Sequence, residues 1–157
     1  MIKKTITSEI EVYSDINELS ENDKNLVEKA KKASEKAFAP YSNFFVGAAV
    51  LLDNDVVVEG NNQENAAFPS GMCAERVALY NAKANFNKAK IKAIAIYAKS
   101  NNFILEKPVY PCGACRQVLI DYELTQKDSI RVIMCSEKGE IIIANDIKTL
   151  MPLHFSF

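Results

Sequence analysis

Three of the four cysteines and one glutamate have the types and spacing of a metal site with a built-in acid–base group. Cys73 stands two residues before Glu75, and Cys112 and Cys115 form a C-x-x-C motif. A structural zinc site has four protein ligands, whereas a catalytic site has three and leaves the fourth position to water. Three thiolates and a nearby carboxylate therefore favour an open zinc site, with Glu75 beside the open position.

The elements that position these residues are expected to be two helices. Good helix formers follow Cys73 and Cys115, so each candidate ligand is predicted at a helix N-terminus. Free backbone N–H groups and the helix dipole stabilise thiolate there. Three thiolates leave a divalent ion with a net negative charge, which makes bound water less acidic. Arg76 or Arg116, in the shell around the ligands, would withdraw part of that charge.

Composition excludes several classes of function. The chain has 157 residues, 25% of them charged, and a net charge of −1. These values give no indication of the basic surface that nucleic acids or anionic membranes require. The first residues contain no apolar signal segment, and no apolar run approaches the roughly 18 residues of a membrane span. Four cysteines in such a chain indicate metal ligands or free thiols, and a cytoplasmic location is expected.

Hydrophobic periodicity predicts strands and helices that alternate along the chain. A half-buried strand is expected over 4–13, and a helix begins near Ser20 and ends before Pro40. The remaining strands are expected as a hairpin over 44–52 and 56–59, a buried strand over 91–98, and two strands over 130–135 and 141–144. This order predicts an α/β layered sheet with parallel pairs.

Four ordered blocks carry a resemblance to a known family. They are Cys73-Ala-Glu-Arg76, Pro111-Cys-Gly-Ala-Cys-Arg-Gln-Val118, the block over 39–52 that begins Ala-Pro-Tyr-Ser-Asn-Phe, and Gly60-Asn-Asn-Gln-Glu-Asn-Ala-Ala-Phe-Pro69. An A-E dipeptide followed by P-C-x-x-C is the signature of zinc-dependent nucleoside and nucleobase deaminases. Within that superfamily the chain resembles the small, three-cysteine cytidine deaminases over roughly residues 26–155.

The resemblance implies a fold and an assembly. The fold would be a three-layer α/β/α cytidine-deaminase fold with a mixed central sheet, built as a single domain over residues 1–157. Members of the family commonly begin close to the first helix, so residues 1–19 would be an added N-terminal strand. Three-cysteine members are typically homotetramers whose active sites are shared between subunits.

The resemblance also implies a reaction. Cys73, Cys112 and Cys115 would hold one zinc ion per subunit, which activates water for attack at C4 of the pyrimidine. Glu75 would take the proton of that water, deliver it to ring N3 and then help to protonate the leaving amine. The product would be uridine or deoxyuridine with ammonia, formed from cytidine or deoxycytidine in pyrimidine salvage.

Five residues match the substrate-binding positions of the family within one subunit. Asn62 and Glu64 would bind the ribose hydroxyl, Phe44 and Val46 would pack against the base, and the backbone of Ala74 would contact it. Periodicity alone makes Phe44 and Val46 ordinary strand core, and Asn and Glu commonly stabilise loops.

The C-terminal segment and two substitutions complete the comparison. Phe155 matches an aromatic residue that reaches a neighbouring subunit's pocket, although an apolar tail can also dock on its own subunit. Phe68 stands where Tyr is frequent, and Phe45 replaces a frequent Pro. Cys135 lies inside an apolar strand and is expected to be a buried thiol outside the ligand set.

Three other functions are alternatives. A blasticidin-S-like deaminase shares the metal and acid–base positions, but the Asn62 and Glu64 pair favours a plain nucleoside. Polynucleotide deaminases usually have His at the first ligand position and need a basic aromatic groove. A zinc-binding module without catalytic activity would not need Glu75.

Overall fold

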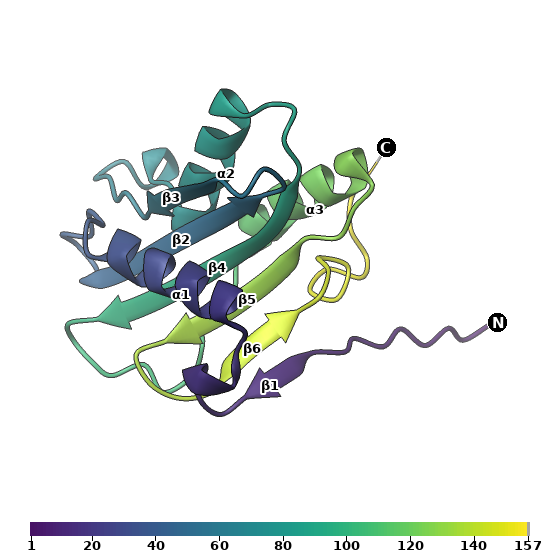
Figure 1. The fold of residues 1–157 in the computed structure, drawn as a ribbon, viewed down its shortest axis with the longest axis horizontal. Helices are drawn as coiled ribbons and strands as arrows, with labels where there is room; N and C mark the ends of the chain where they lie inside the picture. Colours follow the sequence, from purple (N-terminus) through teal and green to yellow (C-terminus); the bar gives the residue numbers. More distant parts are fainter. Residues whose placement is uncertain (157) are drawn as a thin grey trace.

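The computed structural model describes residues 1–156 of the chain. Its centre is a six-stranded sheet with the order β1-β6-β5-β4-β2-β3 (Figure 1). β4 and β5 are parallel, and all other neighbouring strands are antiparallel. The mixed sheet predicted from the sequence is therefore confirmed.

The elements follow one another in an order close to the predicted one. Their bounds are β1 Glu11–Tyr13, α1 Glu21–Ser34, β2 Phe44–Leu52, β3 Val57–Asn61, α2 Ala74–Asn85, β4 Ile91–Ser100, α3 Gly113–Gln126, β5 Arg131–Ser136 and β6 Ile141–Ala144. Two short 3-10 helices, Ile16–Glu18 and Phe68–Ser70, lie in the connections.

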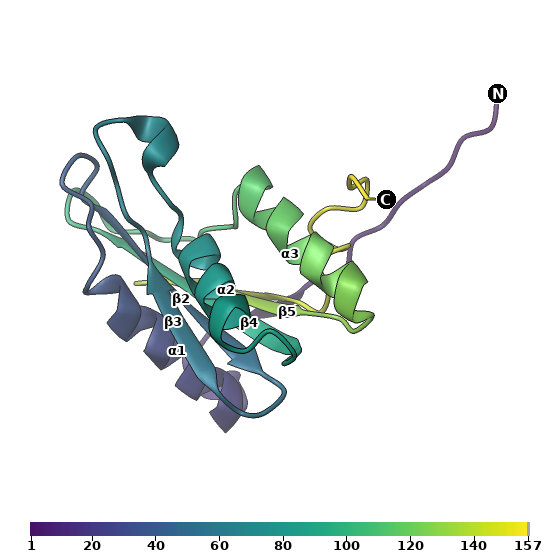
Figure 2. The ribbon, with the colours of Figure 1, turned by 90° about the horizontal axis from the view of Figure 1, so that it is seen from above.

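Helices cover both faces of the sheet. α1 lies on one face, and α2 and α3 lie on the other (Figure 2). β4 is buried on both faces: Ile94 and Ile96 belong to the core beneath α2 and α3, whereas Ala95 and Tyr97 belong to the core beneath α1. This alternation gives the continuous apolar run that predicted a doubly covered strand.

Local signals at α1 act as the sequence predicts. Ser20 is the N-cap, and its hydroxyl accepts a hydrogen bond from the backbone N–H of Asp23. The helix ends at Ser34. This end is earlier than the limit set by Pro40, which disfavours helical backbone only at the residue directly before it. An apolar stripe that includes Leu26, Val27 and Ala30 faces the sheet.

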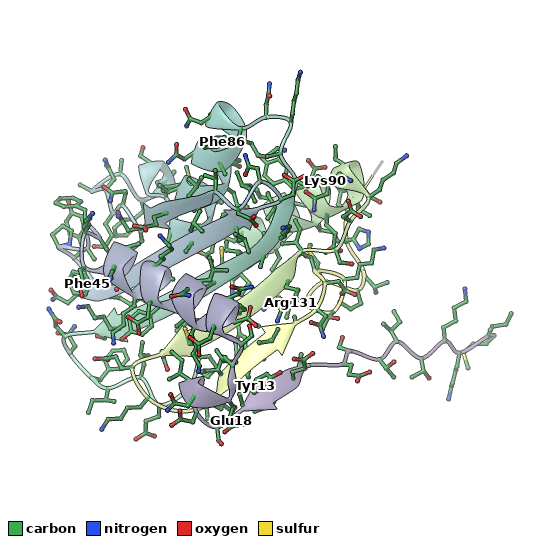
Figure 3. The ribbon with its side chains drawn as sticks, viewed as in Figure 1. Tyr13, Glu18, Phe45, Phe86, Lys90 and Arg131 are labelled. Atoms are coloured by element: carbon green, nitrogen blue, oxygen red, sulfur yellow. The ribbon has the colours of Figure 1, made fainter. Side chains whose placement is uncertain are left out.

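The prediction of a strand over 4–13 is wrong for most of that range. Only Glu11–Tyr13 pairs, antiparallel to β6, and residues 1–10 are exposed. Figure 3 labels Tyr13 on β1 and Glu18 at the end of the 3-10 helix that follows. The Tyr13 hydroxyl donates to Glu11, whose carboxylate also accepts from Asn145 after β6. Before Glu11, the hydrogen bond to the body is the one that the Ser8 hydroxyl donates to the carbonyl oxygen of Thr149, and the isoleucines of residues 1–10 are exposed.

Candidate metal centre and active site

The N-terminal ends of α2 and α3 bring the predicted ligands together. Cys73 is the N-cap of α2, Cys112 is the N-cap of α3, and Cys115 lies in the first turn of α3. Neither cap cysteine uses its side chain for a capping hydrogen bond. All three thiols are therefore placed where helix dipoles favour thiolate.

Gly60 of β3 allows α2 to lie close to the sheet. A Cβ atom at this position would be 2.4 Å from the backbone nitrogen of Ala78 and 2.8 Å from the carbonyl oxygen of Ala74. Both contacts are shorter than side chains tolerate and involve helix backbone. The absence of a side chain at Gly60 therefore sets the depth at which α2, and with it Cys73, is held.

The three sulfurs form a cluster with the dimensions of a zinc site. The Sγ atoms of Cys73 and Cys112 are 3.9 Å apart, those of Cys112 and Cys115 are 3.5 Å apart, and all three lie within 4.8 Å of one another. Ligands about 2.3 Å from zinc in a tetrahedron put neighbouring sulfurs about 3.8 Å apart. Disulfides are excluded, because their sulfurs are about 2.05 Å apart. The donor set therefore fits a zinc ion with three protein ligands.

Arg76 neutralises part of the charge of this cluster. Its NH2 group donates to the sulfur of Cys73 at 3.7 Å. Hydrogen bonding to Cys73, together with the charges of Cys73 and Cys115, raises the pKa of the guanidinium. The predicted position of Arg76 beside the ligand sulfurs agrees with this geometry.

Cys73 has a lower thiol pKa than Cys115. A hydrogen bond from Cys115, followed by the effect of Arg76, lowers the pKa of Cys73 to about 5. The same hydrogen bond and burial raise the pKa of Cys115. Cys73 is therefore a thiolate at neutral pH, as metal binding requires.

Glu75 is buried beside the sulfurs and is 5% exposed. Burial raises the pKa of its carboxyl, and the charge of Cys73 raises that pKa further. A carboxyl whose pKa lies above its ordinary value can accept and return a proton closer to neutral pH. The predicted acid–base group therefore has the environment that such a role needs.

A cavity of about 720 Å³ opens next to the cluster. Its wall contains nine of the predicted site residues: Phe44, Val46, Asn62, Glu64, Cys73, Ala74, Glu75, Arg76 and Cys112. Most of the wall is apolar, and its polar side chains include Asn62, Glu64 and Glu75. This is the pattern of a pocket for a flat, polar-edged small molecule.

Asn62 holds the strand that carries two of the predicted base contacts. Its Oδ1 accepts from the backbone N–H of Val46 at 2.7 Å, and its Nδ2 donates to the carbonyl oxygen of Phe44 at 2.9 Å. The amide therefore fixes the cavity side of β2. It still has a second hydrogen and a second lone pair to offer a ligand.

Glu64 holds the loop that contains Tyr41 and Ser42. Its carboxylate accepts from the backbone N–H of Tyr41 at 2.9 Å and of Ser42 at 3.3 Å, and from the Ser42 hydroxyl. The hydroxyl and then the two backbone groups lower the pKa of Glu64. The residue is therefore an ionised acceptor in the cavity wall.

Comparison with known proteins decides the family. A family model described as the cytidine and deoxycytidylate deaminase zinc-binding region matches residues 20–128, well over half of the chain. The chain belongs to this deaminase family. Zinc is the metal that the family description names, in agreement with the cluster of three sulfurs.

Individual relatives support the same assignment. The chain is 38% identical over 131 residues to a cytidine deaminase of Sporosarcina psychrophila, covering 83% of this chain and 89% of that one. It is 40% identical over 116 residues to one of Halalkalibacterium halodurans, covering 74% and 81%. The crystal structure of cytidine deaminase from Burkholderia pseudomallei superposes with a TM-score of 0.73 at 37% identity, covering 87% of this chain and all of that one.

Arg116 of this deaminase contacts backbone rather than sulfur. Its Nε donates to the carbonyl oxygen of Pro111 at 2.8 Å, and its NH1 donates to that of Leu150 at 2.7 Å. Of the two predicted arginines, Arg76 contacts a ligand sulfur, whereas Arg116 ties the C-terminal segment to the residue before Cys112.

Phe155 lies outside the cavity of its own subunit. The residue is 66% exposed, and its backbone carbonyl oxygen accepts a hydrogen bond from the Gln117 side chain at 3.1 Å. The deaminase chain thus presents this aromatic residue on its surface beside α3.

Several cavity residues were not predicted as site residues. Tyr41, Ser42 and Met72 lie in loops next to predicted residues, and Tyr110 directly precedes Pro111. Tyr41 and Ser42 lie within the block over 39–52, and Met72 and Tyr110 directly precede two other blocks, so their position in the sequence was the available signal. Periodicity does not show which loop side chains point into the cavity. Phe68, noted for its missing hydroxyl, also lines the cavity and is 80% exposed.

Cys135 is separate from the metal cluster. It is buried in β5, and its thiol donates to the carbonyl oxygen of Ile96 at 3.2 Å. The prediction that it is a buried thiol is confirmed. Among the described residues, no helix combines the length and the apolar character of a membrane span.

Proposed function

We propose that this chain catalyses hydrolytic deamination of cytidine and deoxycytidine, giving uridine or deoxyuridine and ammonia. The observation that carries the proposal is the cluster of three sulfurs at the wall of a cavity that also contains a buried glutamate. The relatives named as cytidine deaminases support the substrate class.

Zinc would be held by Cys73, Cys112 and Cys115, and when bound it supplies a Lewis acid that makes water a nucleophile at neutral pH. Arg76 reduces the negative charge of the thiolate set through its contact with Cys73. Arg116 fixes the backbone in front of Cys112 through the carbonyl oxygen of Pro111.

Glu75 carries the protons of the reaction. As a carboxylate it accepts a proton from the attacking water, and as the acid it donates that proton to N3 of the pyrimidine. It then transfers the second water proton to the exocyclic amine, which leaves as ammonia. Burial beside Cys73 supports this role, because both raise the pKa of Glu75 towards the range where proton exchange is efficient.

The cavity wall would hold the base between an apolar and a polar side. Phe44 and Val46 face the cavity from β2 and would pack against the ring. The backbone of Ala74 and Glu75 at the start of α2 would contact the polar edge of the base. Asn62 supports this arrangement by fixing both β2 residues.

The ribose would lie in the part of the cavity lined by Asn62 and Glu64. Glu64 is an ionised acceptor there, and a carboxylate with an amide can recognise a sugar hydroxyl as donor and acceptor. Both residues also organise the wall, so ribose binding and wall geometry would be coupled.

We further propose a homotetramer in which Phe155 reaches the cavity of a neighbouring subunit. Its exposure beside α3 is consistent with such a contact. A cytoplasmic role in pyrimidine salvage is proposed because three free thiols must stay reduced to bind metal.

The assay that tests the function measures ammonia release by the zinc-loaded protein on cytidine, deoxycytidine, free cytosine and blasticidin S. We expect turnover of the two nucleosides, little reaction with free cytosine, and loss of activity after chelation. Glu64→Ala should raise KM for cytidine about tenfold or more, with unchanged zinc content, because a charged hydrogen bond is lost. Reaction with blasticidin S alone, or with no substrate of the panel, would refute the proposal.

A further inference from the structure

We propose that the N-terminal arm, residues 2–10, forms an antiparallel two-stranded ribbon with the same arm of a second copy of this chain. The arm runs away from the body of the molecule, beyond the other elements, in Figures 1 and 2. It lies before residue 20, where the match to the deaminase family begins. The proposal therefore concerns a part of the chain outside the matched region.

The arm has exposed apolar side chains and free backbone. Residues 1–10 are all exposed, with Ile2 at 89%, Ile6 at 54% and Ile10 at 44%. Within residues 1–156, strand pairing begins only at Glu11, and the arm's hydrogen bond to the body is the one from the Ser8 hydroxyl to the carbonyl oxygen of Thr149, 2.8 Å long. An open strand edge of this kind is a template for pairing with another chain.

The arm has the alternation of a strand with one apolar face. In extended backbone, neighbouring side chains point to opposite faces, so one face carries the three isoleucines Ile2, Ile6 and Ile10, with Lys4 and Ser8 between them. Lys3 and Glu9 lie on the other face. Figure 3 shows the arm's side chains projecting into open space from both sides of its trace. Pairing with another strand would be most stabilising if each isoleucine lay opposite an isoleucine of the partner strand.

A second copy supplies that partner in one register. With a two-fold axis at Ile6, the residue numbers of each opposed pair add up to twelve. The pairs are Ile2 with Ile10, Lys3 with Glu9, Lys4 with Ser8, Thr5 with Thr7, and Ile6 with Ile6. Every isoleucine then faces an isoleucine, and each lysine at position 3 faces a glutamate.

Neighbouring registers lose this complementarity. A shift by one residue places the isoleucine face of one arm over the polar face of the other. A shift by two residues places Lys4 opposite Ile10 or Ile6. The interface about Ile6 is isologous, because each copy uses the same surface, so each arm pairs with one partner arm.

The ribbon is expected to form reversibly with concentration. Two strands alone are marginal in water, so the exposed isoleucine face and the two Lys3–Glu9 pairs must provide the association. β1 anchors each arm to its body through Glu11 and Tyr13, which aligns the start of the ribbon.

Cross-linking tests the axis directly in the full, zinc-loaded chain. In the variant Ile6→Cys, the cysteines introduced in the two copies lie opposite each other at the two-fold axis. Mild oxidation should therefore form a disulfide that links position 6 of one chain to position 6 of the other. Lys4→Cys is the matched control, because its two sulfurs would lie about 13 Å apart along the ribbon. Equal cross-linking of the two variants, or no disulfide in Ile6→Cys, would overturn the proposal.

Charge reversal tests the register independently. Lys3→Glu and Glu9→Lys should each raise the dissociation constant measured by sedimentation about tenfold, because each creates two like-charged pairs. The double variant K3E/E9K restores opposite charges and should associate like the native chain. A double variant that associates as weakly as the single variants would contradict the register. Deaminase turnover should be the same in all of them, because the arm is outside the cavity.

Discussion

At the scale of single residues, Glu75 and the three sulfurs are neighbours with separable tasks. The thiols of Cys73, Cys112 and Cys115 form the metal cluster, whereas the carboxyl of Glu75 is buried in the cavity wall. Metal binding and proton transfer should therefore respond differently to substitution. This separation gives a test of the acid–base role that does not confuse it with loss of zinc.

We predict that Glu75→Gln retains zinc and loses most of the turnover of cytidine. Gln has nearly the same shape but cannot accept and return a proton, and general acid–base catalysis is worth about 10²- to 10⁴-fold. Zinc content by metal analysis and kcat by ammonia release would be compared in one preparation. Cys112→Ser is the matched control that should lose both. Turnover of Glu75→Gln within a few-fold of the native rate would refute the role.

Residue identity was also the level at which the sequence was most informative. The sulfurs of Cys73, Cys112 and Cys115 cluster as their spacing predicts, because ligand chemistry restricts the residue types, whereas the catalytic role of Glu75 stays a prediction. The partners of Arg116 did not follow, because they are carbonyl oxygens of Pro111 and Leu150, and backbone acceptors leave no mark in a sequence.

At the scale of elements, the alternation of apolar residues fixed the helices and most strands, but not the N-terminal strand. Residues 4–10 have the same period as a half-buried strand, yet the sheet offers pairing only to Glu11–Tyr13. The alternation of apolar residues indicates which side chains could share one face of a strand. It does not indicate whether a neighbouring strand is present to pair with it. The close approach at Gly60 was equally hidden, because it depends on the position of α2.

We predict that Cys135 makes the fold less stable at alkaline pH. Burial in β5 raises the pKa of its thiol from 9.0 to about 12. Between these values the unfolded chain has lost the proton and the native chain keeps it, so the free energy of unfolding falls as pH rises, by about 1.4 kcal/mol per pH unit. Below pH 9 this contribution to stability is fully present.

Denaturant unfolding of the native chain and of Cys135→Ala measures this effect. From pH 8 to pH 10.5 the native chain should lose about 2 kcal/mol more than the variant. Burial raises the pKa of Tyr97 to about 12 in both proteins, and the charge of Cys135, a smaller cause of that shift, is absent from the variant. Parallel pH profiles for the two proteins would contradict the prediction.

At the scale of the whole molecule, the sulfur cluster joins two helices that are distant in sequence. α2 and α3 pack on the same face of the sheet (Figure 2). The sulfurs of Cys73 and Cys112, the N-caps of these helices, are 3.9 Å apart. Each helix also has its own apolar contacts to the core. The sheet and both helices should therefore form without metal, while zinc stabilises the native arrangement.

Removal of zinc should accordingly lower Tm without abolishing a cooperative transition. A ligand at 100 times its dissociation constant stabilises the native state by about 2.7 kcal/mol, which corresponds to roughly 5–10 °C for a chain of this size. Calorimetry with and without a chelator, followed by zinc addition, measures the shift. Cys135→Ala should keep the shift, because its thiol is outside the cluster, whereas Cys112→Ser should lose it. An equal Tm with and without zinc in the native chain would show that the three sulfurs do not bind the metal in the native state.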